Sequence, residues 1–185
     1  TAENQGAINE GGLDLEGDNA NHYDFDSQVA VSAEHGFTIF LVCKLEGTSA
    51  NMTILSLNST AHFLEFKGGA DSIRIKLAST TTQVNPGDGT QNDFSAGATM
   101  LVTIQRESGA TGNIKLWKNG VILAQDSQAA NTGDAEFVTL GSRNNDRYFD
   151  GIIHDIAFID TGAATTSTTT IDRINAYLMG KHAIN

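Results

Sequence analysis

Residues 142–148, with the sequence SRNNDRY, concentrate hydrogen-bonding groups and one aromatic ring in a single polar stretch. Arg143 and Asn145 could donate hydrogen bonds to hydroxyl groups, and the ring of Tyr148 could contact the apolar face of a sugar. Polar loops at the rim of a rigid scaffold often carry recognition. We therefore predict that Arg143, Asn145 and Tyr148 belong to a ligand site, with an ordinary polar turn as the alternative.

Trp117 is the single tryptophan of the chain. In the alternating run IKLW over 114–117 it shares one strand face with Lys115, opposite the two aliphatic side chains. A Trp ring on a polar face can stack on a sugar ring, which makes Trp117 a further candidate for ligand binding. The competing interpretation is that the ring packs beneath a loop.

The charge of the chain limits its partners. The chain has 22 Asp and Glu residues and 11 Lys and Arg residues, which gives a formal net charge of −11. This charge repels phosphate backbones and argues against a nucleic-acid partner, whereas the carboxylates suit a hard cation such as calcium. No apolar run reaches the roughly 20 residues of a membrane helix, so membrane insertion is not expected. The five histidines have no metal-ligand spacing, and no nucleophile elbow is present.

These side chains must be positioned by β-strands. Short apolar runs alternate with Gly, Asn, Asp, Ser and Thr clusters, which predicts an all-β antiparallel sandwich of two sheets with one short helix over 171–178. Strands are expected at 13–16, 37–45, 52–57, 62–67, 72–77, 99–106, 113–118, 121–125, 136–141 and 152–160. The run over 37–45 is apolar on both faces and predicts a central, doubly covered strand. Asn119-Gly120 predicts a type I′ hairpin turn, and 80–95 a long surface loop.

Four segments resemble the concanavalin A-like lectin/glucanase superfamily, and within it the bacterial and viral laminin G-like domains. They are LDLEGD over 13–18 with YDF over 23–25, LWKNGV over 116–121, YFDGIIHDI over 148–156, and the closing IDRINAYL over 171–178. The resemblance implies a jelly-roll sandwich that spans 1–185 as one domain and often carries a structural calcium ion. It implies Glu16, Asp18 and Asp155 as calcium ligands near the first and last strands; solvated loop carboxylates are the alternative.

Glucanases of this superfamily carry a Glu-x-Asp-x-x-Glu strand that supplies acid and nucleophile, and the spacing is missing here. We therefore expect no catalytic residues and a non-catalytic, lectin-like surface module that binds a glycan or another surface ligand. The alternative is a structural virion protein that docks on neighbouring subunits of a larger assembly. Residues 1–6 are polar and unlike a secretory signal, and either function predicts a place outside the cell or on a virion surface.

Overall fold

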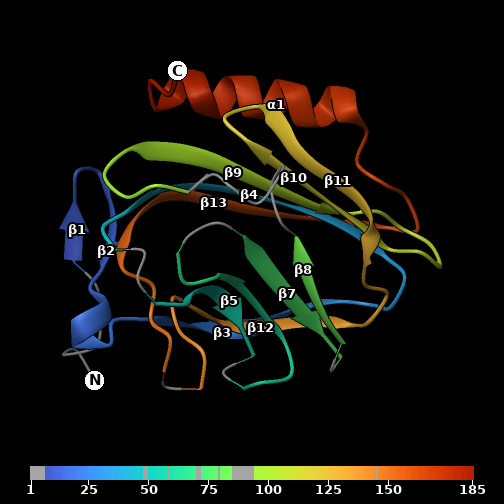
Figure 1. The fold of residues 1–185 in the computed structure, drawn as a ribbon, viewed down its shortest axis with the longest axis horizontal. Coiled ribbons are helices and arrows are strands. Elements are labelled where there is room, and N and C mark those ends of the chain that lie inside the picture. Colours follow the sequence, from blue (N-terminus) through green and yellow to red (C-terminus); the bar gives the residue numbers. More distant parts are fainter. Residues whose placement is uncertain are drawn as a thin grey trace.

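The computed structural model describes residues 7–47, 50–57, 59–69, 72–78, 80–84, 94–144 and 146–185, without the side chains of 124–130. These residues form two antiparallel sheets packed face to face, with one helix lying across the outer face of the larger sheet (Figure 1). The predicted fold class, an all-β sandwich with a C-terminal helix, is confirmed.

The seven-stranded sheet has the order β1-β2-β13-β4-β9-β10-β11. Its strands are β1 (Ala7–Asn9), β2 (Gly12–Leu15), β13 (Gly151–Gly162), β4 (Gly36–Leu45), β9 (Thr99–Arg106), β10 (Asn113–Lys118) and β11 (Val121–Ala130). The six-stranded sheet has the order β3-β12-β5-β6-β7-β8. Its strands are β3 (Tyr23–Val31), β12 (Ala135–Leu140), β5 (Met52–Ser56), β6 (Phe63–Phe66), β7 (Ile73–Leu77) and β8 (Thr80–Val84).

Strand β4 is central and covered on both faces, as its apolar sequence predicts. It pairs with β13 on one side and β9 on the other. Ile39 and Leu41 point into the core between the sheets, whereas Phe40 and Val42 point outward beneath the helix. Cys43 is fully buried on the core face, and burial raises the pKa of its thiol far above the usual value, so it is an inert hydrophobic side chain.

The helix α1 (Thr168–Lys181) is longer than the sequence predicts. Ser167 is its N-cap: the Ser167 hydroxyl accepts a hydrogen bond from the Thr170 N–H. The helix runs through Gly180 and ends at Lys181, with His182 as its C-cap. Ile171 and Leu178 pack onto the sheet, and Asn175 accepts a buried hydrogen bond from Thr103 on β9 (2.7 Å). Within the described part of the chain, no helix has the length and apolar character needed to cross a membrane.

The predicted hairpin turn is confirmed, but the sequence did not predict three of the strands, β1, β3 and β8. Asn119 and Gly120 have φ angles of 48° and 75° and join β10 to β11, which confirms the predicted hairpin. The expected loop over 80–95 is wrong at its start, because residues 80–84 form strand β8, an edge strand paired with β7. Strand β3 was not predicted; it is an edge strand whose exposed residues weaken the apolar signal.

Leu116→Ala is expected to lower the free energy of unfolding by about 2–5 kcal/mol, because Leu116 is buried in the core between the sheets and its loss leaves a cavity. Urea denaturation of the purified chain measures the change. Val121→Ala, at an exposed position on the adjoining strand, is the control and should change stability by at most about 0.5 kcal/mol. A loss that small for Leu116→Ala would contradict the assigned strand face.

Candidate functional site

Three segments meet at one end of the sandwich and line an open depression of about 250 Å³, which we call the rim pocket. One segment follows β2, one joins β4 to β5, and one precedes β13. The lining residues are Gly17, Asp18, Gly47, Ala50, Asn51, Met52, Asp146, Arg147, Tyr148 and Asp150. The stretch over 142–148 that the sequence singles out therefore contributes directly to a pocket.

Asp150 joins the segments that line the pocket. Its carboxylate Oδ1 accepts a hydrogen bond from the Gly17 N–H (3.3 Å), and its backbone carbonyl accepts one from the Glu46 N–H (3.0 Å). A Cβ atom at Gly47 would clash with the Asp150 carboxylate, so glycine permits the close approach of the two segments. On the far side, the Thr53 N–H on β5 donates to the Arg147 carbonyl (3.0 Å). The pocket is thus built on hydrogen-bonded backbone.

The rim pocket is acidic and rich in hydrogen-bond acceptors. Among the described residues that line it, Asp18, Asp146 and Asp150 supply three carboxylates and Arg147 supplies the one cation. The side-chain oxygen of Asn51 is already engaged within the protein, since this Oδ1 accepts a hydrogen bond from the Gly68 N–H (2.7 Å). Carboxylates accept hydrogen bonds from hydroxyl groups and repel anions. The arrangement therefore suits a neutral ligand with many hydroxyls.

Tyr148 is the aromatic residue of the rim pocket. Its ring is half-buried, with its centroid 6.2 Å from that of His22. The next residue, Phe149, is fully buried in the core, and its N–H donates to the Gly141 carbonyl (2.8 Å). The buried and hydrogen-bonded Phe149 fixes the chain at this point and so holds the preceding residue, Tyr148, at the pocket. Of the predicted ligand-binding residues that the structure describes, Tyr148 is the one that lines the rim pocket.

Arg143 does not line the pocket. It is 7% exposed, and its guanidinium lies 3.9 Å from the centre of the Phe63 ring and 3.2 Å from the carboxylate of Glu65, which is fully buried. Burial lowers the pKa of Arg143, and the charge of Glu65 opposes that shift. The expectation that Arg143 hydrogen-bonds a ligand is corrected: it holds the loop onto the six-stranded sheet. Asn145, the neighbouring candidate, lies outside the described residues.

Trp117 does not line the rim pocket; it lies on the outer face of the seven-stranded sheet beneath α1. It shares the predicted face with Lys115, but its side chain is 3% exposed and packs in a cluster with Phe40 and Ile171. Trp117 borders a shallow depression beside α1, but with 3% of the residue exposed its ring has no open face on which a sugar could stack. The alternative interpretation of the sequence, a packed tryptophan, is correct, although a helix and not a loop covers it.

The three predicted calcium ligands do not converge. Asp18 lines the rim pocket, whereas Asp155 accepts hydrogen bonds from Lys181 (2.6 Å) and His182 (2.5 Å) at the end of α1. Burial alone would raise the pKa of Asp155, but these two hydrogen bonds hold it below its usual value. Asp155 is therefore engaged in fastening the helix, because its position on β13 faces α1.

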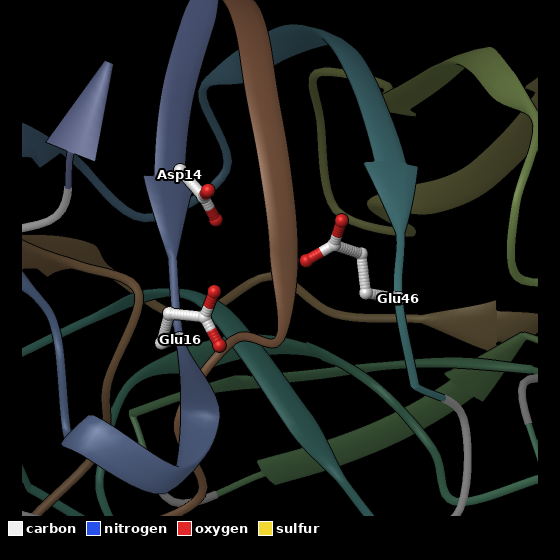
Figure 2. Close-up of side chains that lie close together, drawn as sticks. All are labelled: Asp14, Glu16 and Glu46. Carbon is white, nitrogen blue, oxygen red and sulfur yellow. The ribbon is translucent and has the colours of Figure 1, made fainter. Parts of the chain in front are cut away.

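Glu16 instead joins two carboxylates that the sequence did not single out. Oxygen atoms of Asp14, Glu16 and Glu46 lie within 4.8 Å of one another, and we call these residues the acidic group (Figure 2). Asp14 and Glu16 come from the end of β2, and Glu46 follows β4, on the other side of β13. Burial, and then the charges of Asp14 and Glu16, raise the pKa of Glu46. The group is thus an accumulation of negative charge.

Solved structures share this fold at low sequence identity. The CBM40 domain of the Ruminococcus gnavus IT-sialidase, bound to alpha2,3 sialyllactose, is 13% identical with a TM-score of 0.54 over 84% of this chain and 98% of that one. A heptameric SAP-like pentraxin from Limulus polyphemus is 10% identical with a TM-score of 0.60 over 93% and 80%. Domain 4 of AbnA, a GH43 extracellular arabinanase from Geobacillus stearothermophilus, in complex with arabinotriose, is 15% identical with a TM-score of 0.50 over 78% and 68%.

No protein-family model and no curated protein matches the sequence. At the identities above, the similarity to solved structures concerns the fold alone, a jelly-roll sandwich of two antiparallel sheets.

Proposed function

We propose that the chain is a non-catalytic, lectin-like recognition module of laminin G-like type that binds a neutral glycan in the rim pocket. The observation that carries the proposal is the pocket itself, where three carboxylates, one guanidinium and the Tyr148 ring converge on hydrogen-bonded backbone. Sugars are recognised by this combination, because hydroxyl groups need hydrogen-bond acceptors and donors while the ring faces need an apolar surface.

The similar folds support a glycan as the ligand class. The CBM40 domain is bound to sialyllactose and the arabinanase domain to arabinotriose, so this sandwich accommodates oligosaccharides in two other proteins. The charge of the rim pocket narrows the class for this chain. Three aspartates against one arginine repel a carboxylate such as that of sialic acid, so the preferred sugar is uncharged.

The test is binding to an array of neutral and sialylated oligosaccharides, with the protein displayed multivalently because one pocket of this size binds weakly. We expect signals on neutral glycans that Tyr148→Ala reduces about five- to tenfold, since loss of an aromatic contact weakens binding by about 1–1.4 kcal/mol. Tyr177→Ala is the matched control, because Tyr177 is an exposed tyrosine on α1. Its glycan signals should equal those of the unmodified chain.

Two results would contradict the proposal: the absence of binding to every glycan, or binding that Tyr148→Ala leaves unchanged. Hydrolysis of a polysaccharide by the purified chain would contradict the non-catalytic part.

Sedimentation of the same samples addresses the alternative, docking on neighbouring subunits of a larger assembly. Stable assembly without glycan signals would favour a structural virion role. Either function places the module outside the cell or on a virion surface.

A further inference from the structure

We propose that His22 adds a second sugar subsite to the rim pocket, so that the chain binds at least two linked neutral sugar units. This inference rests on the proposed function, because it assigns a further residue to the same site. His22 directly precedes strand β3 and does not line the pocket itself. Its ring centroid lies 6.2 Å from that of Tyr148, with 37° between the ring planes, and both residues are partly exposed. The two rings therefore lie next to each other where Tyr148 borders the pocket.

The segment that carries His22 is fixed by hydrogen bonds. After β2 the chain forms a short 3-10 helix over Gly17–Asn19. Asn21 closes this segment: its N–H donates to the Glu16 carbonyl (3.4 Å), and its Oδ1 accepts a hydrogen bond from the Glu16 N–H (3.1 Å). The segment contributes to the lining of the rim pocket and, at its end, places His22 beside Tyr148. A site held in this way loses little conformational entropy when a ligand binds.

Gly141 connects the backbone of His22 to that of Tyr148. A Cβ atom at Gly141 would clash with the Leu15 side chain at 2.6 Å and would lie 3.7 Å from the Cα atom of His22. The φ angle of 89° at this position also favours glycine. The Gly141 carbonyl accepts the hydrogen bond from the N–H of Phe149, the residue after Tyr148. The backbone thus positions the two aromatic residues relative to each other.

The hydrogen bonding of His22 leaves one ring nitrogen for a ligand. Its Nδ1 lies 3.0 Å from the Ala20 carbonyl oxygen. A carbonyl only accepts, so Nδ1 carries the proton of this hydrogen bond, and Nε2 of the neutral ring is an acceptor. Nε2 has no hydrogen-bond partner among the described residues. His22 therefore offers an acceptor for a sugar hydroxyl together with a ring face, as Tyr148 offers a hydroxyl and a ring face.

Two neighbouring rings suit a chain of sugars. One sugar ring covers one aromatic ring, so a sugar that contacts Tyr148 and hydrogen-bonds inside the rim pocket leaves His22 uncovered. The centre of the His22 ring lies 6.2 Å from that of Tyr148, which places the next linked sugar unit beside His22. The ligand class is therefore a neutral oligosaccharide, and a monosaccharide uses the Tyr148 subsite alone.

The test compares ligands of different length by NMR titration of the purified chain. The probes are malto-, cello-, xylo- and arabino-oligosaccharides of one, two and three sugar units. We expect two or three units to bind about tenfold more tightly than one, since the second unit adds a ring contact and a hydrogen bond. His22→Ala should remove this gain and leave the affinity for one unit unchanged. Tyr148→Ala should weaken binding at every length.

Two further variants control for loss of folding and for unspecific effects. His22→Gln keeps a hydrogen-bond acceptor without the aromatic ring and should retain part of the gain. His35→Ala is the matched control, because His35 is a partly exposed histidine that does not line the rim pocket. It should bind every length as the unmodified chain does. All these variants should melt within about 2 °C of the unmodified chain, since the substitutions lie outside the core.

The contrary results separate this inference from the proposed function. If Tyr148→Ala weakens binding while His22→Ala retains the gain with length, the second subsite is rejected and the neutral-glycan function stands. The same holds if the unmodified chain binds one sugar unit as tightly as three. If no probe and no glycan of the array binds, the proposed function is rejected and the second subsite with it.

Discussion

Replacing Arg106 with Ala is expected to lower the free energy of unfolding by about 3–5 kcal/mol, because a fully buried guanidinium would be removed from the partners that depend on it. Arg106 donates hydrogen bonds to the backbone carbonyls of Ser32 (3.0 Å), His35 (2.8 Å) and Gly133, and its guanidinium lies 4.8 Å from the centre of the Phe37 ring. The substitution leaves three carbonyl groups without a donor and opens a cavity beside the ring.

Urea denaturation followed by circular dichroism measures this loss. Arg173→Ala on the exposed face of α1 is the control and should change stability by at most about 0.5 kcal/mol. Burial lowers the pKa of Arg106 to about 10, so the group still carries its charge at neutral pH. A loss below about 1 kcal/mol for Arg106→Ala would show that water replaces the guanidinium at these carbonyls.

Glu65→Gln is expected to cost about 3–5 kcal/mol, because it removes the charge partner of a buried arginine while hardly changing the volume of the side chain. Glu65 is fully buried and forms ion pairs with Arg74 and Arg143. Arg74 retains contact with water, with 24% of its side chain exposed. Arg143 has 8% of its side chain exposed and would lose its main counter-charge while it stays buried. The loss falls mainly on the loop that Arg143 holds.

Equilibrium unfolding of Glu65→Gln, Arg143→Gln and the double variant forms a cycle that isolates the coupling. The double variant should lose less than the sum of the two single variants. Glu136→Gln, on the same sheet with 39% of its side chain exposed, is the control and should be close to neutral. Additive losses in the cycle would contradict the coupling between Glu65 and Arg143.

Local pattern in the sequence was sufficient for most of the fold. Alternating apolar residues placed ten strands, and the apolar run over 37–45 correctly indicated a strand covered on both faces. Asn119-Gly120 indicated its hairpin, because the preference for positive φ is a property of those two residues. Polar edge strands such as β8 were not predicted, because an edge strand needs less apolar surface and its apolar residues therefore alternate less clearly.

The candidate site depended on contacts between distant segments. The sequence identified 142–148 as a recognition stretch, and Tyr148 of this stretch lines the rim pocket. Arg143 of the same stretch is buried against Glu65 on another strand, and no local feature of the sequence separates these two residues. Likewise, the sequence correctly placed Trp117 on the same strand face as Lys115. It did not show that this face is covered, because the covering helix begins more than 50 residues later in the chain.

The sequence by itself therefore determined the fold class, the strand faces, the hairpin and the acidic character of the chain, because these follow from side-chain period and composition. Tertiary structure alone decided which carboxylates meet: Asp14 and Glu16 lie next to Glu46, while Asp155 binds the end of α1. The physical reason is strand order. Insertion of β13 between β2 and β4 brings together residues about 30 positions apart, and no local pattern encodes that order.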